Sequence, residues 1–164
     1  MGSGKSTIGK KIANKMGYNF IDLDQELEKN EGKSIESIFD CNGEQYFRNL
    51  ESDWLKSFKA DKTIVSLGGG TPCFNNNIET INYNGKSVYL KMNVGLLTDR
   101  LINAKQKRPL IEQYKSDKAE LKHQVELLLT SREKYYGQAH LTFEADNMSK
   151  EKLNSLIDQI NASF

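Results

Sequence analysis

The sequence predicts an α/β protein in which a parallel sheet lies between two layers of helices. Two observations support this prediction. Residues 2–7 read Gly-Ser-Gly-Lys-Ser-Thr and run directly into an amphipathic helix with Ile8, Ile12 and Met16 on one face. Short apolar segments near residues 19, 63, 86 and 141 then alternate with helical segments, which is the order of strand–helix–strand crossovers in a parallel sheet. Such sheets hold their ligands at the carboxyl ends of the strands.

Residues 2–7 have the composition of the second half of a phosphate-binding P-loop. Glycines let the backbone wrap closely, so that successive N–H groups and the positive end of the following helix point at one anion. Lys5 is expected to reach the β- and γ-phosphates of ATP, and the Ser6 hydroxyl to ligate Mg²⁺. The residues expected to contact ATP here are Gly2, Ser3, Gly4, Lys5, Ser6 and Thr7. The alternative is a Gly/Ser linker ahead of a helix.

The P-loop pattern G-x-x-x-x-G-K-[ST] also requires a glycine three residues before Gly2 and a buried strand ahead of the loop. The sequence contains neither. We therefore expect the strands near residues 19, 63, 86 and 141 to flank a vacancy at the centre of the sheet, with unpaired backbone groups on both sides. We further expect Met1 to be an internal methionine of a longer chain, preceded by about ten residues that contain an apolar run and a glycine.

Length and composition favour one domain over residues 1–164. The net charge is +1, from 23 basic and 22 acidic residues, which argues against nucleic-acid and membrane partners. No apolar run approaches the ~18 residues of a membrane span, and no signal peptide is recognisable. Cys41 and Cys73 lack metal-ligand spacing. We expect a cytoplasmic monomer with reduced cysteines.

Two acidic residues follow the first predicted strand, Tyr18-Asn19-Phe20-Ile21. In Asp22-Leu23-Asp24, strand alternation turns both carboxylates to the same side, at the end of the strand where α/β sheets bind ligands. Asp22 is expected to hold Mg²⁺ through water beside Ser6, and Asp24 to face the hydroxyl of an acceptor. The alternative is a pair of solvated turn acids.

Residues 25–60 contain no convincing strand and are expected to form a helical, substrate-binding cap over the mouth of the sheet. Ser34 caps a short helix, Asn42-Gly43 interrupts it, and a longer helix runs from Glu44 to about Phe58. Arg48 borders the apolar stripe of the longer helix. Its side chain is therefore aimed into the cleft or snorkels at the edge of the stripe.

The next predicted strand, over 63–67, runs into Gly68-Gly69-Gly70. Three consecutive glycines cost backbone entropy, which is explained if a ligand lies against bare backbone; the alternative is a flexible turn. A strand over 86–92 and a helix with Leu97 follow. Residues from about 103 to 118 are then expected to form a basic lid that brings Arg108 to the phosphates, the alternative being a solvated basic turn.

A helix over about 116–136 carries an arginine within its apolar line. The line consists of Leu121, Val125, Leu128, Arg132, Tyr136 and Ala139. An unpaired buried guanidinium is very unfavourable, so Arg132 should meet a bound or an internal anion. The alternatives are a partly exposed end of the stripe and a structural ion pair. A strand over 140–145 and a helix that Ser149 caps complete the chain.

Several stretches match one family in order along nearly the whole chain. They are Gly2 to Gly9, Phe20 to Asp24, Ser34 to Phe39, Gly43 to Glu51, Gly68 to Gly70, Arg108-Pro109-Leu110, and Arg132 through Tyr136 to Ala139. On these residues the chain resembles the shikimate kinase family, which implies a P-loop kinase fold. One position differs: an arginine often found seven residues before the lid's Arg-Pro is Leu101 here, next to Arg100.

The resemblance implies transfer of the ATP γ-phosphoryl group to the 3-hydroxyl of shikimate, with Mg²⁺ as cofactor, in aromatic amino-acid biosynthesis. It implies that Asp24 binds the shikimate hydroxyls and that Arg48 and Arg132 clamp the carboxylate. Gly69 and Gly70 are implied to offer backbone N–H groups to the substrate. The implied catalytic residues are Lys5, Asp24 and Arg108.

Two rival interpretations remain open at this point. One is a P-loop kinase for another small hydroxylated acid such as gluconate, which gives no reason for Arg48 and Arg132 to converge. The other is a non-catalytic domain of the same fold. The presence of Lys5, Ser6, Asp22 and Asp24 argues against it.

Overall fold

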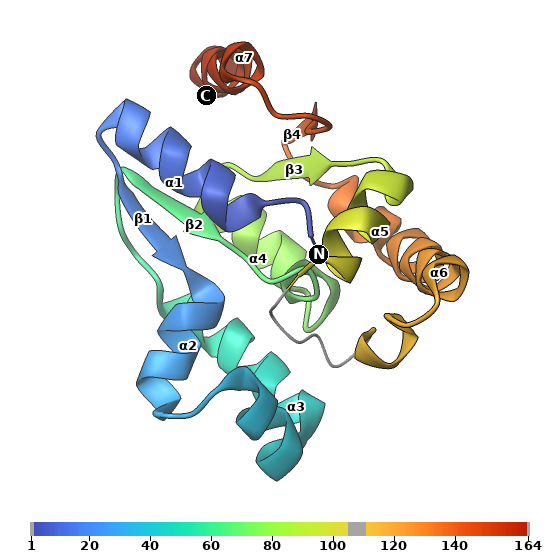
Figure 1. The fold of residues 1–164 in the computed structure, drawn as a ribbon. Coiled ribbons are helices and arrows are strands. Elements are labelled where there is room, and N and C mark those ends of the chain that lie inside the picture. The colour runs from blue at the N-terminus through green and yellow to red at the C-terminus, as the bar shows by residue number, and fades with distance from the viewer. Residues whose placement is uncertain (1, 105–110, 164) are drawn as a thin grey trace.

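Helices and short strands alternate along the chain in the predicted order (Figure 1). The computed structural model describes residues 2–104 and 111–163. The helices are α1 (Lys5–Met16), α2 (Leu23–Glu31), α3 (Ile35–Ser57), α4 (Asn77–Asn84), α5 (Val94–Ile102), α6 (Lys118–Tyr136) and α7 (Lys150–Ser163), with 3₁₀ turns η1 (Thr71–Cys73) and η2 (Glu112–Tyr114). The strands are β1 (Asn19–Asp22), β2 (Thr63–Ser66), β3 (Val88–Lys91) and β4 (Leu141–Glu144). None of the helices formed by the described residues is long and apolar enough to cross a membrane.

The four strands form two parallel pairs rather than one continuous sheet. β1 pairs with β2, with Asn19 opposite Thr63 and Asp22 opposite Ser66, and β3 pairs with β4 in the same parallel sense. Within residues 2–104 and 111–163 no ladder joins β2 to β3. The parallel direction agrees with the sequence prediction, and the separation of the two pairs agrees with the expected vacancy.

Helix α1 bridges the two strand pairs on one face. An apolar cluster joins Ile8 and Ile12 of α1 to residues of β4 and α7, namely Phe143, Leu153 and Leu156. Ile64 of β2 and Val88 of β3 both pack against this cluster, so burial of shared apolar surface connects the pairs. Helices α4 and α6 lie on the other side of the strands (Figure 1), which gives the three predicted layers.

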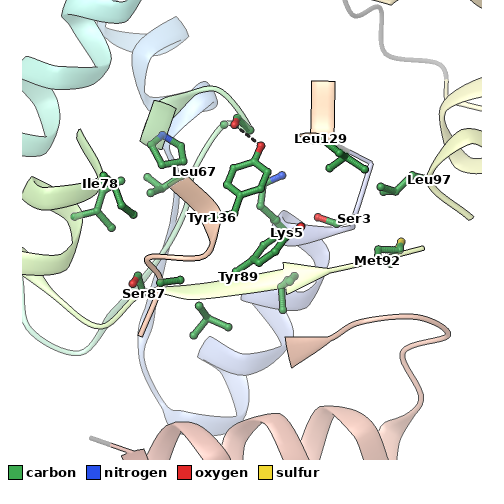
Figure 2. Close-up of a pocket in the computed structure, with 17 residues that line it drawn as sticks. Ser3, Lys5, Leu67, Ile78, Ser87, Tyr89, Met92, Leu97, Leu129 and Tyr136 are labelled. Carbon is green, nitrogen blue, oxygen red and sulfur yellow. Dashed lines mark hydrogen bonds between the residues drawn. The ribbon is translucent and has the colours of Figure 1, made fainter. Parts of the chain in front are cut away.

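A small cavity lies between the strand pairs and the helices of the second layer. Its volume is about 110 Å³, and it is lined by Leu67 after β2, Tyr89 of β3, Ile78 of α4 and Leu129 of α6, among others (Figure 2). The lining is mostly apolar side chains, so the interior between β2 and β3 is incompletely filled.

The structure corrects the local setting of Asp24. The sequence places Asp22 and Asp24 together on a strand end, but β1 ends at Asp22 and Asp24 lies in the first turn of α2. The reason is the intervening Leu23, which begins the helix and is completely buried against Ile38 and Phe47 of α3. Acidic residues in a first helical turn also interact favourably with the helix dipole.

Helix α3 is continuous but kinked at the predicted interruption. Its N-cap is Ser34, whose hydroxyl accepts the Ser37 N–H at 3.2 Å. Gly43 has φ 82° and ψ 169°, outside the helical region, and this positive φ favours glycine. The two predicted helices are therefore the two arms of α3.

Candidate active site

A cavity of about 580 Å³ lies at the carboxyl ends of β1 and β2. It is lined by predicted site residues from distant parts of the chain: Gly2, Gly4, Lys5, Ser6, Thr7, Asp22, Asp24, Arg48, Gly69, Gly70 and Arg132. Ser3 lines the smaller cavity between the strand pairs instead. Arg108, predicted to come from the lid, lies in residues 105–110, outside the described part of the chain.

The loop ahead of α1 has the backbone conformation that a phosphate site needs. Gly2 and Gly4 have φ values of 72° and 82°, in the left-handed region that side chains disfavour. Gly4 is the N-cap of α1, and the Ile8 N–H donates to its carbonyl at 2.9 Å. Because Ile8 and Ile12 are buried, α1 is fixed with its N-terminal N–H groups at the cavity.

Three oxygen-bearing side chains meet beside the loop. The Ser6 hydroxyl donates to Asp22 Oδ2 and lies 3.3 Å from Ser66 Oγ at the end of β2. Mg²⁺ prefers such hard oxygen ligands and usually combines one or two carboxylates with waters and substrate phosphates. The chemistry of this donor set therefore fits Mg²⁺. Ser66 is a member of this set that the sequence analysis missed.

Asp24 changes protonation near neutral pH. Its pKa is raised from 3.8 to about 6, chiefly because burial disfavours the charged carboxylate, and then because Asp22 and Glu51 add negative charge nearby. The positive charge of Lys5 acts in the opposite direction. A carboxylate with such a pKa is suited to accept a proton from a substrate.

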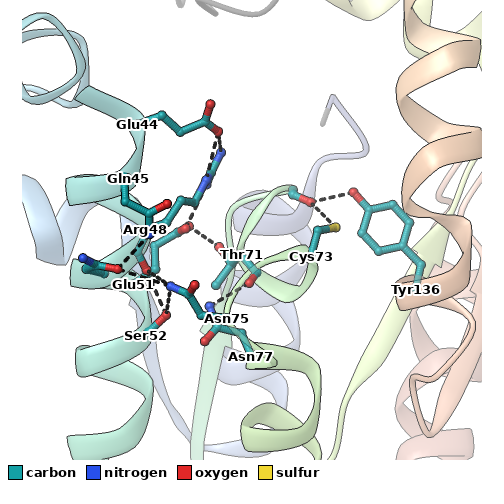
Figure 3. Close-up of polar contacts among 12 residues, drawn as sticks. Glu44, Gln45, Arg48, Glu51, Ser52, Thr71, Cys73, Asn75, Asn77 and Tyr136 are labelled. Atoms are coloured by element: carbon teal, nitrogen blue, oxygen red, sulfur yellow. Dashed lines mark hydrogen bonds and ion pairs between the residues drawn. The ribbon is translucent and has the colours of Figure 1, made fainter.

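Arg48 does not snorkel, because only 5% of its surface is exposed. Its Nη1 donates to Glu51 Oε2 at 2.8 Å, while Nη2 and Nε donate to Glu44 Oε1 at 2.8 and 3.1 Å (Figure 3). The centre of the guanidinium lies 4.4 Å from the centroid of the Phe74 ring. These contacts compensate the burial of the charge and fix the guanidinium in the wall of the cavity.

Glu51 is the main site residue that the sequence analysis missed. It is completely buried, and besides Arg48 it accepts a hydrogen bond from the Thr71 hydroxyl at the start of η1. The spacing was visible in the sequence, since Glu44 and Glu51 stand four residues before and three residues after Arg48 on one helix. Residues at these spacings share a helix face.

The Gly68–Gly70 run lies directly against the site side chains. A Cβ atom at Gly70 would stand 2.8 Å from Arg48 Nη1, and one at Gly68 would stand 3.1 Å from Asp24 Oδ1. Neither residue has a positive φ, so close approach, rather than backbone conformation, favours glycine here. Contact of the run with a ligand stays a prediction.

Arg132 reaches the cavity from α6 but is half-buried rather than enclosed in the core. Leu121 and Val125 are buried, whereas the apolar line leaves the core farther along α6, where Arg132 and Tyr136 are both partly exposed. Of the alternatives for Arg132, its burial therefore agrees with a partly exposed end of the apolar stripe. In the part of the chain that is described, no carboxylate forms an ion pair with Arg132.

Packing beside the P-loop explains why position 101 is a leucine rather than the arginine often found there in the family. Leu101 is completely buried and lies against Gly2, where an added Cβ would be 3.3 Å from it. Arg100 instead lines the cavity and donates to the Gly2 carbonyl at 3.5 Å. Arg100, not position 101, therefore presents a cation beside the P-loop.

Comparison with protein families and relatives gives one consistent result. The family model described as "SKI: Shikimate kinase" matches residues 1–161. A shikimate kinase of Azobacteroides pseudotrichonymphae is 41% identical over 162 residues, covering 98% of this chain and 92% of the relative. A shikimate kinase of Chlorobium phaeobacteroides is 45% identical over 149 residues, covering 88% of this chain and 78% of the relative.

Solved structures are similar over nearly the whole chain. The shikimate kinase from Bacteroides thetaiotaomicron has a TM-score of 0.86 and 35% identity, covering 99% of this chain and 92% of that one. The shikimate kinase from Acinetobacter baumannii in complex with shikimate has a TM-score of 0.79 and 30% identity, covering 98% of this chain and 86% of that one. The predicted P-loop kinase fold is confirmed. By its sequence, its fold and the cavity that these build, the chain belongs to the shikimate kinase family of ATP-dependent kinases.

Proposed function

We propose that this chain transfers the γ-phosphoryl group of ATP to the 3-hydroxyl of shikimate, giving shikimate 3-phosphate and ADP. The observation that carries the proposal is one cavity in which a P-loop, a carboxylate of raised pKa and arginines from two separate helices meet. The hydroxyl oxygen bonds to the γ-phosphorus while the bond from that phosphorus to the β–γ bridging oxygen breaks. Asp24 orients the hydroxyl and is the group placed to accept its proton.

The P-loop accounts for the nucleotide half of the reaction. Backbone N–H groups of residues 2–7 and the N-terminus of α1 hold the phosphates, and Lys5 binds the β- and γ-phosphates. Ser6 and Asp22 would hold Mg²⁺, Asp22 through water, and the ion would supply positive charge that offsets the negative charge of the phosphates. Arg108 is assigned to the transferred phosphate from the family resemblance alone.

Arg48 and Arg132 account for binding of the acceptor's carboxylate. They approach the cavity from α3 and α6, and a guanidinium binds a planar carboxylate through two parallel hydrogen bonds. Gly69 and Gly70 supply backbone N–H groups in the same region. Shikimate and gluconate both carry a carboxylate, so the match to the shikimate kinase family, rather than the arginines, favours shikimate over gluconate, the second candidate acceptor.

Release of ADP with each acceptor tests the assignment. The chain, supplied with MgATP, should release ADP with shikimate and stay near background with gluconate, and removal of Mg²⁺ by EDTA should stop turnover until excess Mg²⁺ is restored. Absence of shikimate-dependent ADP release would contradict the proposed function. Turnover of gluconate at a comparable rate would favour the alternative acceptor.

We also propose that the chain works in the cytoplasm as a monomer. Cys41 and Cys73 are free thiols, in keeping with a reducing compartment. Size-exclusion chromatography with light scattering measures the oligomeric state.

A further inference from the structure

Tyr136 contacts the glycine run that lies against Arg48. Its hydroxyl donates to the Gly69 carbonyl at 2.6 Å (Figures 2 and 3), and its ring packs on Tyr89, with the ring centroids 4.9 Å apart. The Cys73 thiol adds a second, weaker donor to the same carbonyl at 3.8 Å. The position of the Gly69 carbonyl is thus set from the side of α6.

This contact also sets the direction of the next amide. In a trans peptide the C=O and N–H groups point in opposite directions, so a Gly69 carbonyl that faces Tyr136 turns the Gly70 N–H away from α6. On that opposite side lies α3 with Arg48 (Figure 3), whose guanidinium would be 2.8 Å from a Cβ of Gly70. Within residues 2–104 and 111–163 the Gly70 N–H donates no hydrogen bond.

A peptide between two glycines is unusually free to rotate, because neither residue has a Cβ that opposes the turn. Rotation of the Gly69–Gly70 peptide would replace the N–H beside Arg48 with a carbonyl oxygen. A carbonyl oxygen repels a carboxylate, whereas an N–H donates to it. The hydrogen bond from Tyr136 therefore stabilises the orientation of the Gly69–Gly70 peptide that binds an anion over the one that repels it.

The same hydroxyl interacts with the second arginine. Burial raises the pKa of Tyr136, and Arg132, one helical turn earlier on α6, opposes this through its charge and a side-chain hydrogen bond. The Tyr136 hydroxyl that bonds to the glycine run is therefore also within electrostatic range of Arg132.

We propose that Tyr136 is a positioning residue for the acceptor: its hydroxyl holds the Gly69–Gly70 peptide so that the Gly70 N–H donates, beside Arg48, to the carboxylate of the substrate. The proposal rests on the proposed function, because it takes that substrate to be shikimate.

The test compares two tyrosines of the same ring pair. Tyr136→Phe keeps the ring and removes the hydroxyl, while Tyr89→Phe removes a neighbouring hydroxyl that donates to Glu133 at 3.3 Å and, among the described residues, makes no hydrogen bond to the glycine run. For each variant, calorimetry gives the shikimate Kd without nucleotide, and kinetics give both KM values. Tyr136→Phe should raise the shikimate Kd and KM about 3- to 10-fold, as expected for one hydrogen bond. The KM for ATP should change less than twofold, and Tyr89→Phe should leave shikimate binding unchanged.

Other outcomes contradict the proposal. An unchanged shikimate Kd in Tyr136→Phe overturns it, and so do equal rises of the two KM values or equal effects of the two variants, since those indicate a merely structural role. If Tyr136→Phe fails to fold, nuclear magnetic resonance of the wild type decides. The resonance of the Gly70 amide proton should shift downfield when shikimate is added but not when ADP is added. An unchanged chemical shift with shikimate overturns the proposal. If the wild type shows no shikimate-dependent turnover, the proposed function and this inference are both overturned. If the wild type is active but Tyr136→Phe leaves the shikimate Kd unchanged, this inference alone is overturned.

Discussion

Asp24→Asn is expected to stabilise the folded chain while it abolishes phosphorylation of shikimate. The pKa of Asp24 is raised from 3.8 to about 6, first by burial and then by the charges of Asp22 and Glu51. Because folding raises this pKa, the group favours the folded state below about pH 3.8 and loses that contribution as the pH rises through 6. At neutral pH its charge therefore destabilises the fold.

The magnitude follows from the two pKa values. A rise from 3.8 to about 6 corresponds to about 3 kcal/mol, at about 1.4 kcal/mol per pKa unit. Asparagine has nearly the same shape and no charge. The free energy of unfolding of Asp24→Asn should therefore exceed that of the wild type by up to about 3 kcal/mol at pH 8, and the two should converge near pH 4.

Urea unfolding at pH 4, 6 and 8, without nucleotide and with EDTA, measures this difference. Titration of groups far from residue 24 cancels when variant and wild type are compared at each pH. Asp53→Asn is a matched control on α3, because the Asp53 side chain is 76% exposed and lies 3.9 Å from Lys56. Its effect should stay within about 0.5 kcal/mol at every pH. A difference for Asp24→Asn that is equal at pH 4 and pH 8, or a less stable variant at pH 8, would refute the reasoning.

Three further changes address the acceptor clamp, the buried ion pair and the gap between the strand pairs. Arg132→Ala should raise the KM for shikimate by about 10- to 100-fold, the value of charge-assisted hydrogen bonds, and the KM for ATP far less; equal rises in steady-state kinetics would count against a carboxylate clamp. Glu51→Gln should lower the free energy of unfolding by about 2–4 kcal/mol, because it leaves buried Arg48 with one partly exposed carboxylate; an unchanged urea midpoint would show that the pair contributes little. An apolar strand of about five residues fused ahead of the P-loop should raise Tm by several degrees, because it can pair with the edges of β2 and β3; calorimetry measures the shift, and an unchanged Tm would contradict pairing.

Elements with strong periodicity could be predicted from the sequence. The apolar line of α6 predicts a helix over about 116–136, and the helix runs Lys118–Tyr136, because the spacing of the line identifies one helix face whatever packs on it. The separation of the strand pairs was also predictable, since the P-loop pattern specifies a preceding strand that the sequence does not contain.

The boundary between β1 and α2 could not be predicted. A short Asp-Leu-Asp segment suits the end of a strand and the first turn of a helix equally well. Burial of Leu23 against α3 decides in favour of the helix, and this is a tertiary contact that the local sequence does not encode.

The roles of Arg48 and Tyr136 depend on partners far away in the chain. The sequence does not decide whether Arg48 is buried or lies at the edge of its stripe. The reason is that its environment includes Thr71, which donates to Glu51 and stands 20 residues after it in the chain. Tyr136 lay inside a matched segment, yet its acceptor is a peptide carbonyl 67 residues away. A backbone atom has no side-chain signature, so sequence patterns alone could not have revealed this contact.

The two carboxylates around Arg48 differ in how they can respond to a substrate. Glu51 is completely buried and also bound by Thr71, so it is fixed. Glu44 has 43% of its side chain exposed and can return to water at little cost. Glu44 also accepts from both Nε and Nη2 of Arg48. These two nitrogens form a side of the guanidinium that can bind a carboxylate bidentately. We therefore expect a substrate carboxylate to displace Glu44 while Glu51 stays, because this exchange keeps the buried charge compensated in both the free and the loaded states.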